Sequence, residues 1–139
     1  MKLSTRGEYA ARAVMEIALR GSQRPVKIRD IAQRQDIPLK YLESILLTLQ
    51  RAGVVRSKRG ANGGYYLARP AEAITVGEVI RAMDGPLAPI GCVSVSAYEF
   101  CPREGICGLK WVWQETRNAI AEVLDNTTFA EVCERAPKR

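Results

Sequence analysis

Residues 28–67 read IRDIAQRQDIPLKYLESILLTLQRAGVVRSKRGANGGYYL, and this stretch decides the fold. Apolar side chains recur at helical spacing up to Gln35-Asp36, where the first helix ends. Pro38 then begins a second helix, which Gly53 terminates. Two helices joined by a tight turn predict a helix-turn-helix.

The end of the same stretch predicts a β-hairpin. Val54 to Lys58 has the composition of a strand, and a returning strand follows at Tyr65 to Ala68. The turn between them contains Asn62-Gly63, a pair that favours hairpins. We therefore expect a wing over residues 54–68, directly after the helix-turn-helix.

The flanking segments contain three Thr-x-x-Glu capping boxes, which begin at Thr5, Thr75 and Thr128. Each box precedes apolar residues at helical intervals. We expect one helix from about residue 5 to 20 with Gly21 as its stop, a second that stops at Gly85, and a short terminal helix that contains Cys133 as a packed thiol.

A long amphipathic helix is predicted from Leu109 onward. Its apolar stripe continues for more than four turns and comprises Leu109, Val112, Trp113, Thr116, Ala119, Ile120, Val123 and Leu124. Such a stripe is too long for a small domain to bury, whereas a helix from a second copy would cover it. Packing within its own chain is the alternative.

The predicted fold class is mostly α with a small β-hairpin wing: a winged helix-turn-helix with a long C-terminal dimerisation helix. We expect a DNA-binding domain at residues 1–85, a cysteine-containing loop at 86–108, and the dimerisation helix and terminal helix at 109–139. A chain of 139 residues suits one domain with such an appendage.

Positive charge is concentrated in the first part of the chain. Residues 1–60 hold 13 Lys and Arg against 5 Asp and Glu, whereas residues 61–139 hold 8 against 10, giving net charges of +8 and −2. Clustered cations favour a nucleic-acid partner because they displace counterions from phosphates. The sequence shows no signal peptide and no membrane span, so we expect a cytoplasmic protein without a membrane partner.

A winged helix places its second helix in the major groove and its wing against the backbone or minor groove of DNA. Lys40 suits phosphates or guanine, Glu43 suits the cytosine amino group, and Ser44 can donate or accept. Arg59, at the wing tip, is suited to the minor groove. The full set of expected DNA contacts is Arg29, Lys40, Tyr41, Glu43, Ser44, Arg56, Lys58, Arg59, Asn62 and Gly63. The alternative is an ordinary solvated surface.

Cys92, Cys101 and Cys107 follow one another with eight and then five residues between them, in a chain that has no histidine. The absence of imidazole excludes sites that depend on histidine, and it leaves sulfur-rich metal binding as the sharpest hypothesis. A zinc site, a thiol-disulfide switch and unused thiols remain as alternatives. Zinc is disfavoured because the loop lacks close Cys-x-x-Cys pairs.

Three motifs together resemble the Rrf2 family of bacterial winged-helix transcription regulators, and in particular its iron-sulfur members of the IscR and NsrR type. They are Leu3 to Ala10 (LSTRGEYA), Tyr41-Leu42-Glu43, and Arg59 to Tyr65 (RGANGGY). The resemblance covers nearly the whole chain. The chain departs from the family at its first cysteine gap, which is eight residues instead of five, and at Lys27, where relatives often have a capping Ser or Thr.

The resemblance implies a homodimer that binds double-stranded operator DNA with two half-sites. It also implies an iron-sulfur cluster, with 4Fe-4S favoured and 2Fe-2S as the alternative, held by Cys92, Cys101 and Cys107. Glu8 of the other subunit matches a fourth-ligand position of the family, and Arg12 lies one turn away from it. The competing explanation for Glu8 is a helix cap that bonds the Thr5 amide.

We therefore expect a homodimeric transcription regulator that senses redox state, nitric oxide or iron-sulfur status. The alternative is a winged-helix regulator without a cluster, gated by a thiol switch, a small molecule or a partner protein. An enzyme is disfavoured because no histidine, no convergent carboxylate pair and no phosphate-cradling loop is present in the sequence.

Overall fold

The computed structural model describes residues 2–21 and 24–138. Its elements are α1 (Thr5–Leu19), α2 (Ile28–Gln35), α3 (Leu39–Arg51), β1 (Val55–Lys58), β2 (Gly64–Leu67), α4 (Val76–Asp84), α5 (Lys110–Asp125) and α6 (Phe129–Arg135), with short 3-10 turns at Ala71–Ala73, Gly91–Val93 and Glu104–Ile106. The predicted mostly helical fold with one hairpin is confirmed.

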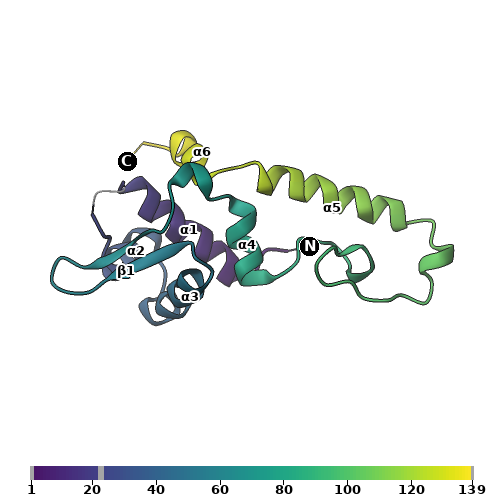
Figure 1. Ribbon diagram of the computed structural model, residues 1–139, viewed down its shortest axis with the longest axis horizontal. Helices are drawn as coiled ribbons and strands as arrows, with labels where there is room; N and C mark the ends of the chain where they lie inside the picture. The colour runs from purple at the N-terminus through teal and green to yellow at the C-terminus, as the bar shows by residue number, and fades with distance from the viewer. Residues whose placement is uncertain (1, 22–23, 139) are drawn as a thin grey trace.

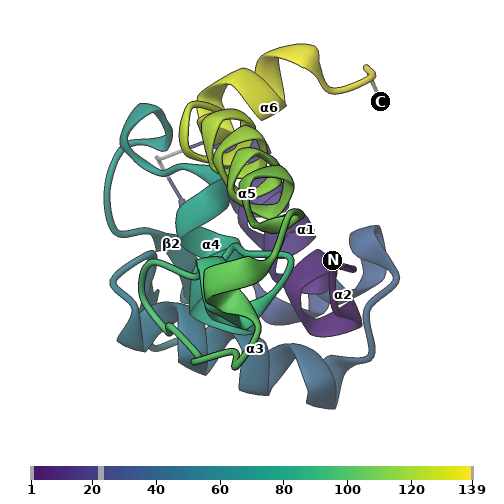
Figure 2. The same ribbon diagram turned by 90° about the vertical axis from the view of Figure 1, so that its right-hand side faces the viewer.

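Helix α1 lies at the centre of the body and packs against α2, α3, α4 and α6. Its buried Ala10, Val14 and Ile17 meet Leu42 and Leu46 of α3 in one hydrophobic cluster. Helix α5 leaves this body and extends away from it, and the loop before α5 lies at the far end (Figure 1). The view along α5 shows α3 and α6 on opposite sides of the molecule (Figure 2).

The start of α1 differs from the predicted capping box. Ser4 is the N-cap, and its hydroxyl accepts a hydrogen bond from the Gly7 amide at 2.9 Å, one residue before the expected Thr5 position. Ser4 also reaches the Asp84 carboxylate at the end of α4. The serine is favoured because its side chain satisfies an exposed helix amide and ties α1 to α4 at the same time.

The wing is an antiparallel hairpin whose register pairs Val55 with Leu67 and Lys58 with Gly64. A backbone bridge joins it to the segment before α2: the Val26 amide donates to the Tyr65 carbonyl at 2.7 Å, and the Tyr65 amide donates to the Val26 carbonyl at 2.8 Å. The bridge holds the hairpin against the helix-turn-helix.

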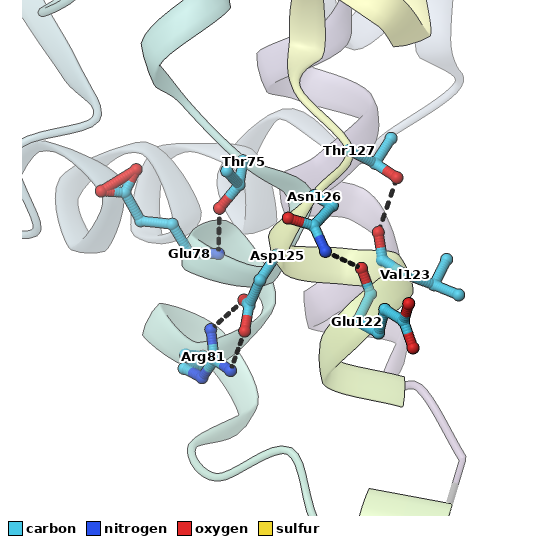
Figure 3. A network of polar contacts seen from close by, with 8 residues as sticks. All are labelled: Thr75, Glu78, Arg81, Glu122, Val123, Asp125, Asn126 and Thr127. Carbon is cyan, nitrogen blue, oxygen red and sulfur yellow. Dashed lines mark hydrogen bonds and ion pairs between the residues drawn. The ribbon is translucent and has the colours of Figure 1, made fainter. Parts of the chain in front are cut away.

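The ends of α4, α5 and α6 meet at one junction. Thr75 and Thr128 cap α4 and α6 as predicted, since each hydroxyl accepts the amide three residues later at 3.2 Å. The Val76 amide donates to the Thr127 carbonyl at 2.9 Å. Arg81 contacts the Asp125 carboxylate through both terminal nitrogens, so that the end of α5 is fixed to α4 (Figure 3).

No residue of α5 is fully buried. Four residues of the predicted stripe are half-buried by the rest of this chain, namely Val112, Trp113, Ile120 and Leu124. Leu109, Trp111 and Val123 are more than half exposed. Among the helices of residues 2–21 and 24–138, none has the length and hydrophobicity needed to cross a membrane.

Candidate DNA-binding surface and cysteine loop

Helix α3 is anchored by its apolar face and exposes its polar face. Leu42, Ile45, Leu46 and Leu49 are fully buried in the core. The predicted contact residues project from the other face, because they occupy the remaining positions of the same turns. Lys40, Tyr41, Glu43 and Ser44 are all exposed.

Arg6 of α1 braces the exposed face of α3. Its terminal nitrogens donate to the Ser44 hydroxyl at 2.9 Å and to the Thr48 hydroxyl at 2.8 Å. A serine hydroxyl can accept one hydrogen bond and donate another. Ser44 accepts from Arg6 and can therefore still donate to a further acceptor. The predicted DNA contacts did not include Arg6, although it lies in the basic first half of the chain and in the Leu3 to Ala10 motif.

Tyr41 connects the same face to Glu8 through aromatic and ionic contacts. Its ring meets that of Tyr9 edge-on, with centroids 5.7 Å apart. The Arg12 guanidinium lies 5.4 Å from the Tyr9 ring centroid and 3.7 Å from the Glu8 carboxylate. A change at Glu8 is therefore connected by direct contacts to α3, the second helix of the helix-turn-helix, which we call the recognition helix.

Glu8 pairs with Arg12, while Ser4 serves as the helix cap. The expectation that a capping bond to the Thr5 amide explains Glu8 is therefore wrong. The Glu8 side chain is 60% exposed, so its carboxylate is accessible to a group from outside the chain.

The wing exposes its basic residues and buries one predicted contact. Arg56, Lys58, Arg59 and Asn62 are exposed, as is Arg29 in the first turn of α2. Gly63 is buried, and a side chain there would overlap the Lys58 carbonyl oxygen. Position 63 is a glycine because the tight path of the wing turn leaves no room for a side chain.

The three cysteines lie on one loop between α4 and α5. Cys92 and Cys101 are half-buried, Cys107 is exposed, and all three are free thiols. Over the described residues, no three side chains of Cys, Asp or Glu gather in an arrangement that could hold a metal ion. Cysteine thiols are the ligands that iron-sulfur clusters use, so the side chains of this loop fit such a cluster chemically. The loop is open, however, in the sense that the three thiols are not gathered around one site.

Polar contacts hold the loop in its open arrangement. The Tyr98 hydroxyl donates to the Glu104 carboxylate at 2.5 Å, and Lys110 of α5 lies 3.4 Å from the other carboxylate oxygen. This hydrogen bond raises the pKa of Tyr98 and lowers that of Glu104. Charge on Cys92 or Cys101 would also raise the Tyr98 pKa. No sequence pattern predicted this contact among Tyr98, Glu104 and Lys110.

Comparison with known proteins agrees with this architecture. The family profile described as "Rrf2: Iron-dependent Transcriptional regulator" matches residues 3–135. Protein rrf2 of Nitratidesulfovibrio vulgaris is 42% identical over 95% of this chain and 87% of its own length. The regulator IscR of Erwinia tasmaniensis is 37% identical over 95% of this chain and 79% of its own.

A solved structure has the same fold over nearly the whole chain. CymR, described as the global cysteine regulator of B. subtilis, superposes with a TM-score of 0.85 at 34% identity and covers 99% of each chain. The predicted resemblance is thereby confirmed, and both the family profile and IscR are described as transcription regulators. The chain belongs to the Rrf2 family of winged-helix transcription regulators.

Proposed function

We propose that this regulator is a homodimer that binds an operator with two half-sites and responds to redox state, nitric oxide or iron supply through an iron-sulfur cluster. The observation that carries the proposal is the loop itself: three free cysteines on one segment that leads directly into α5. A cluster supplies a redox-active centre that reactive small molecules attack.

Cys92, Cys101 and Cys107 would hold the cluster, and Glu8 of the other subunit would complete the set. Binding all three thiols requires residues 87–108 to close from the open arrangement. Because Glu8 pairs with Arg12, which lies over Tyr9 beside Tyr41, ligation by Glu8 would change the surroundings of the recognition helix. The two recognition helices must match half-sites about one helical turn apart, so a small change in their relative position alters affinity.

DNA selection tests this function. Duplexes would be selected from a random library with anaerobically reconstituted protein and with cluster-free protein. We expect paired half-sites and an affinity that differs between the two forms. Equal affinity of the two forms for every selected duplex would contradict the sensing role.

Glu8 has a separate test. Glu8→Ala is expected to shift the visible spectrum of the reconstituted cluster or to hasten its loss in air, because one oxygen ligand is removed. Glu134→Gln, an exposed carboxylate of α6, is the control and should change neither. An unaltered spectrum and lifetime in Glu8→Ala would exclude Glu8 as a ligand.

A second function is supported by the open loop and by the likeness to CymR. In this alternative the thiols themselves are the switch, without a cluster. Iron-free protein would then change its DNA affinity on treatment with diamide and recover it with dithiothreitol. Alanine at Cys92, Cys101 and Cys107 would abolish that response.

A further inference from the structure

A basic groove lies beside the wing, apart from the exposed face of α3. It has a volume of about 510 Å³ and is lined by Arg24, Pro25, Lys27, Lys58, Asn62 and Gly63. A second hollow of about 320 Å³ continues past Lys27 along the first turn of α2 and the wing turn. Lys58, Asn62 and Gly63 come from the hairpin, and Arg24, Pro25 and Lys27 precede α2.

The cations of this groove have no anionic partner among residues 2–21 and 24–138. Arg24, Lys27 and Lys58 form no ion pair or side-chain hydrogen bond in the part of the chain that the structure describes. By contrast, Arg12, Arg69 and Arg81 are each paired with a carboxylate. Like charges that share one groove repel each other, and an external anion relieves that repulsion.

The groove is held in shape by the backbone. The Val26–Tyr65 bridge lies between Lys27 and the wing and fixes the two walls relative to each other. Gly64 permits this close approach, since a Cβ there would overlap the Val26 carbonyl. Lys27 occupies the N-cap of α2, where its ammonium group cannot accept a hydrogen bond from a helix amide. The Lys27 side chain is exposed and has no ion pair among the described residues, so its ammonium group is available to a ligand.

We infer that Arg24, Lys27 and Lys58 form a phosphate-binding groove for the DNA backbone beside the wing. The inference depends on the proposed DNA binding and extends the footprint beyond α3 and the wing tip. Two of these cations, Arg24 and Lys27, lie outside the predicted contact set. The contacts are to phosphate, so they add affinity for every sequence and no base preference.

Salt dependence of binding to a random-sequence 30-base-pair duplex tests the groove, because that binding is mainly electrostatic. Each neutralised phosphate contributes about 0.9 to the slope of log K against log salt. The triple variant Arg24→Gln/Lys27→Gln/Lys58→Gln is expected to lower the slope by about 2 to 3. Each single variant should lower it by about 0.9, which preserves the test if the triple variant does not fold.

The control removes the same charge far from the wing. Arg103→Gln/Arg135→Gln/Lys138→Gln alters three exposed cations, one on the cysteine loop and two near the C-terminus, none of which lines the groove. The cysteine loop lies at the opposite end of the molecule from the wing (Figure 1). Equal slopes for the two triple variants would contradict the inference that this groove binds DNA phosphates, although the protein would still bind DNA. No binding by the unaltered protein would overturn the proposed function itself. Tight binding of inorganic phosphate to the protein alone, lost in the groove variant, would make this a small-anion site and contradict the inference.

Discussion

Arg81 of α4 and Asp125, the last residue of α5, form a two-pronged ion pair, with Nη2 and Oδ2 2.8 Å apart. This pair joins the helix that extends from the body to the domain that contains α3 (Figure 3). Gly77 lies so close that a side chain there would overlap the Asp125 carboxylate. These contacts therefore restrict the angle between α5 and α4.

The ion pair gives stability a defined pH dependence. Hydrogen bonding from Arg81 lowers the pKa of Asp125 in the folded protein. The ion pair therefore stabilises the fold fully above the ordinary carboxyl pKa of about 4. This stabilisation is lost as the pH falls through the lower pKa that Asp125 has in the folded protein.

Asp125→Asn should reduce the free energy of unfolding at pH 7 by at most about 1 kcal/mol, because both partners are well exposed to solvent. The difference from the unaltered protein should shrink at pH 3 and below. Urea unfolding at the two pH values measures both effects, with Glu122→Gln as a control expected to change neither. An equal loss at both pH values would contradict the assigned role of the ion pair.

Arg6→Ala should weaken DNA binding even though the substitution removes no direct contact to a base. It deletes two hydrogen bonds that hold Ser44 and Thr48, and a bond of about 1 kcal/mol corresponds to a roughly fivefold change in affinity. Fluorescence anisotropy with a selected duplex measures the change. Thr48→Val keeps the Ser44 bond and should have the smaller effect; a larger effect than that of Arg6→Ala would refute the bracing role.

Gly63→Ala should disrupt the wing, since the added methyl group would overlap the Lys58 carbonyl oxygen. We expect loss of DNA affinity and altered amide signals over residues 55–67 in an NMR spectrum, with the helix signals retained. Ala61→Ser, at an exposed position of the same turn, is the matched control. Native wing signals in Gly63→Ala would show that the turn is not as tight as described.

Val123→Glu should separate the proposed dimer. The Val123 side chain is 64% exposed on α5, and a charge there would be buried against the second copy. Sedimentation velocity should show a smaller species at micromolar concentration. Gln114→Glu adds the same charge off the predicted stripe and should leave the dimer intact; a monomer in both variants, or a dimer in both, would argue against this face.

Local sequence signals predicted most of the fold. Periodicity and the turn pair Asn62-Gly63 identified the helices and the wing because these depend on neighbouring residues. The first cap was assigned one residue late, since Thr5 has a glutamate three residues later and Ser4 does not, whereas the contact between Ser4 and Asp84 that accompanies the observed cap is long-range.

Long-range contacts account for what the sequence did not predict. Arg6 and Ser44 are 38 residues apart, and Arg81 and Asp125 are 44 apart, so neither pair leaves a local signature. Gly63 was expected to approach DNA, whereas its burial follows from the path of the wing backbone. The spacing of the cysteines placed them on one loop but contained no information about how closely the thiols approach.

The most direct test of the cluster is an anaerobic ultraviolet-visible spectrum, with iron and sulfide analysis, of protein reconstituted with iron and sulfide. It would be recorded beside the Cys92→Ala/Cys101→Ala/Cys107→Ala variant, with Cys133→Ala as the matched thiol control. The account predicts broad absorbance near about 400 nm with iron and acid-labile sulfide in the unaltered protein and in Cys133→Ala, and neither in the triple variant. Identical spectra and iron contents in all three proteins would contradict it.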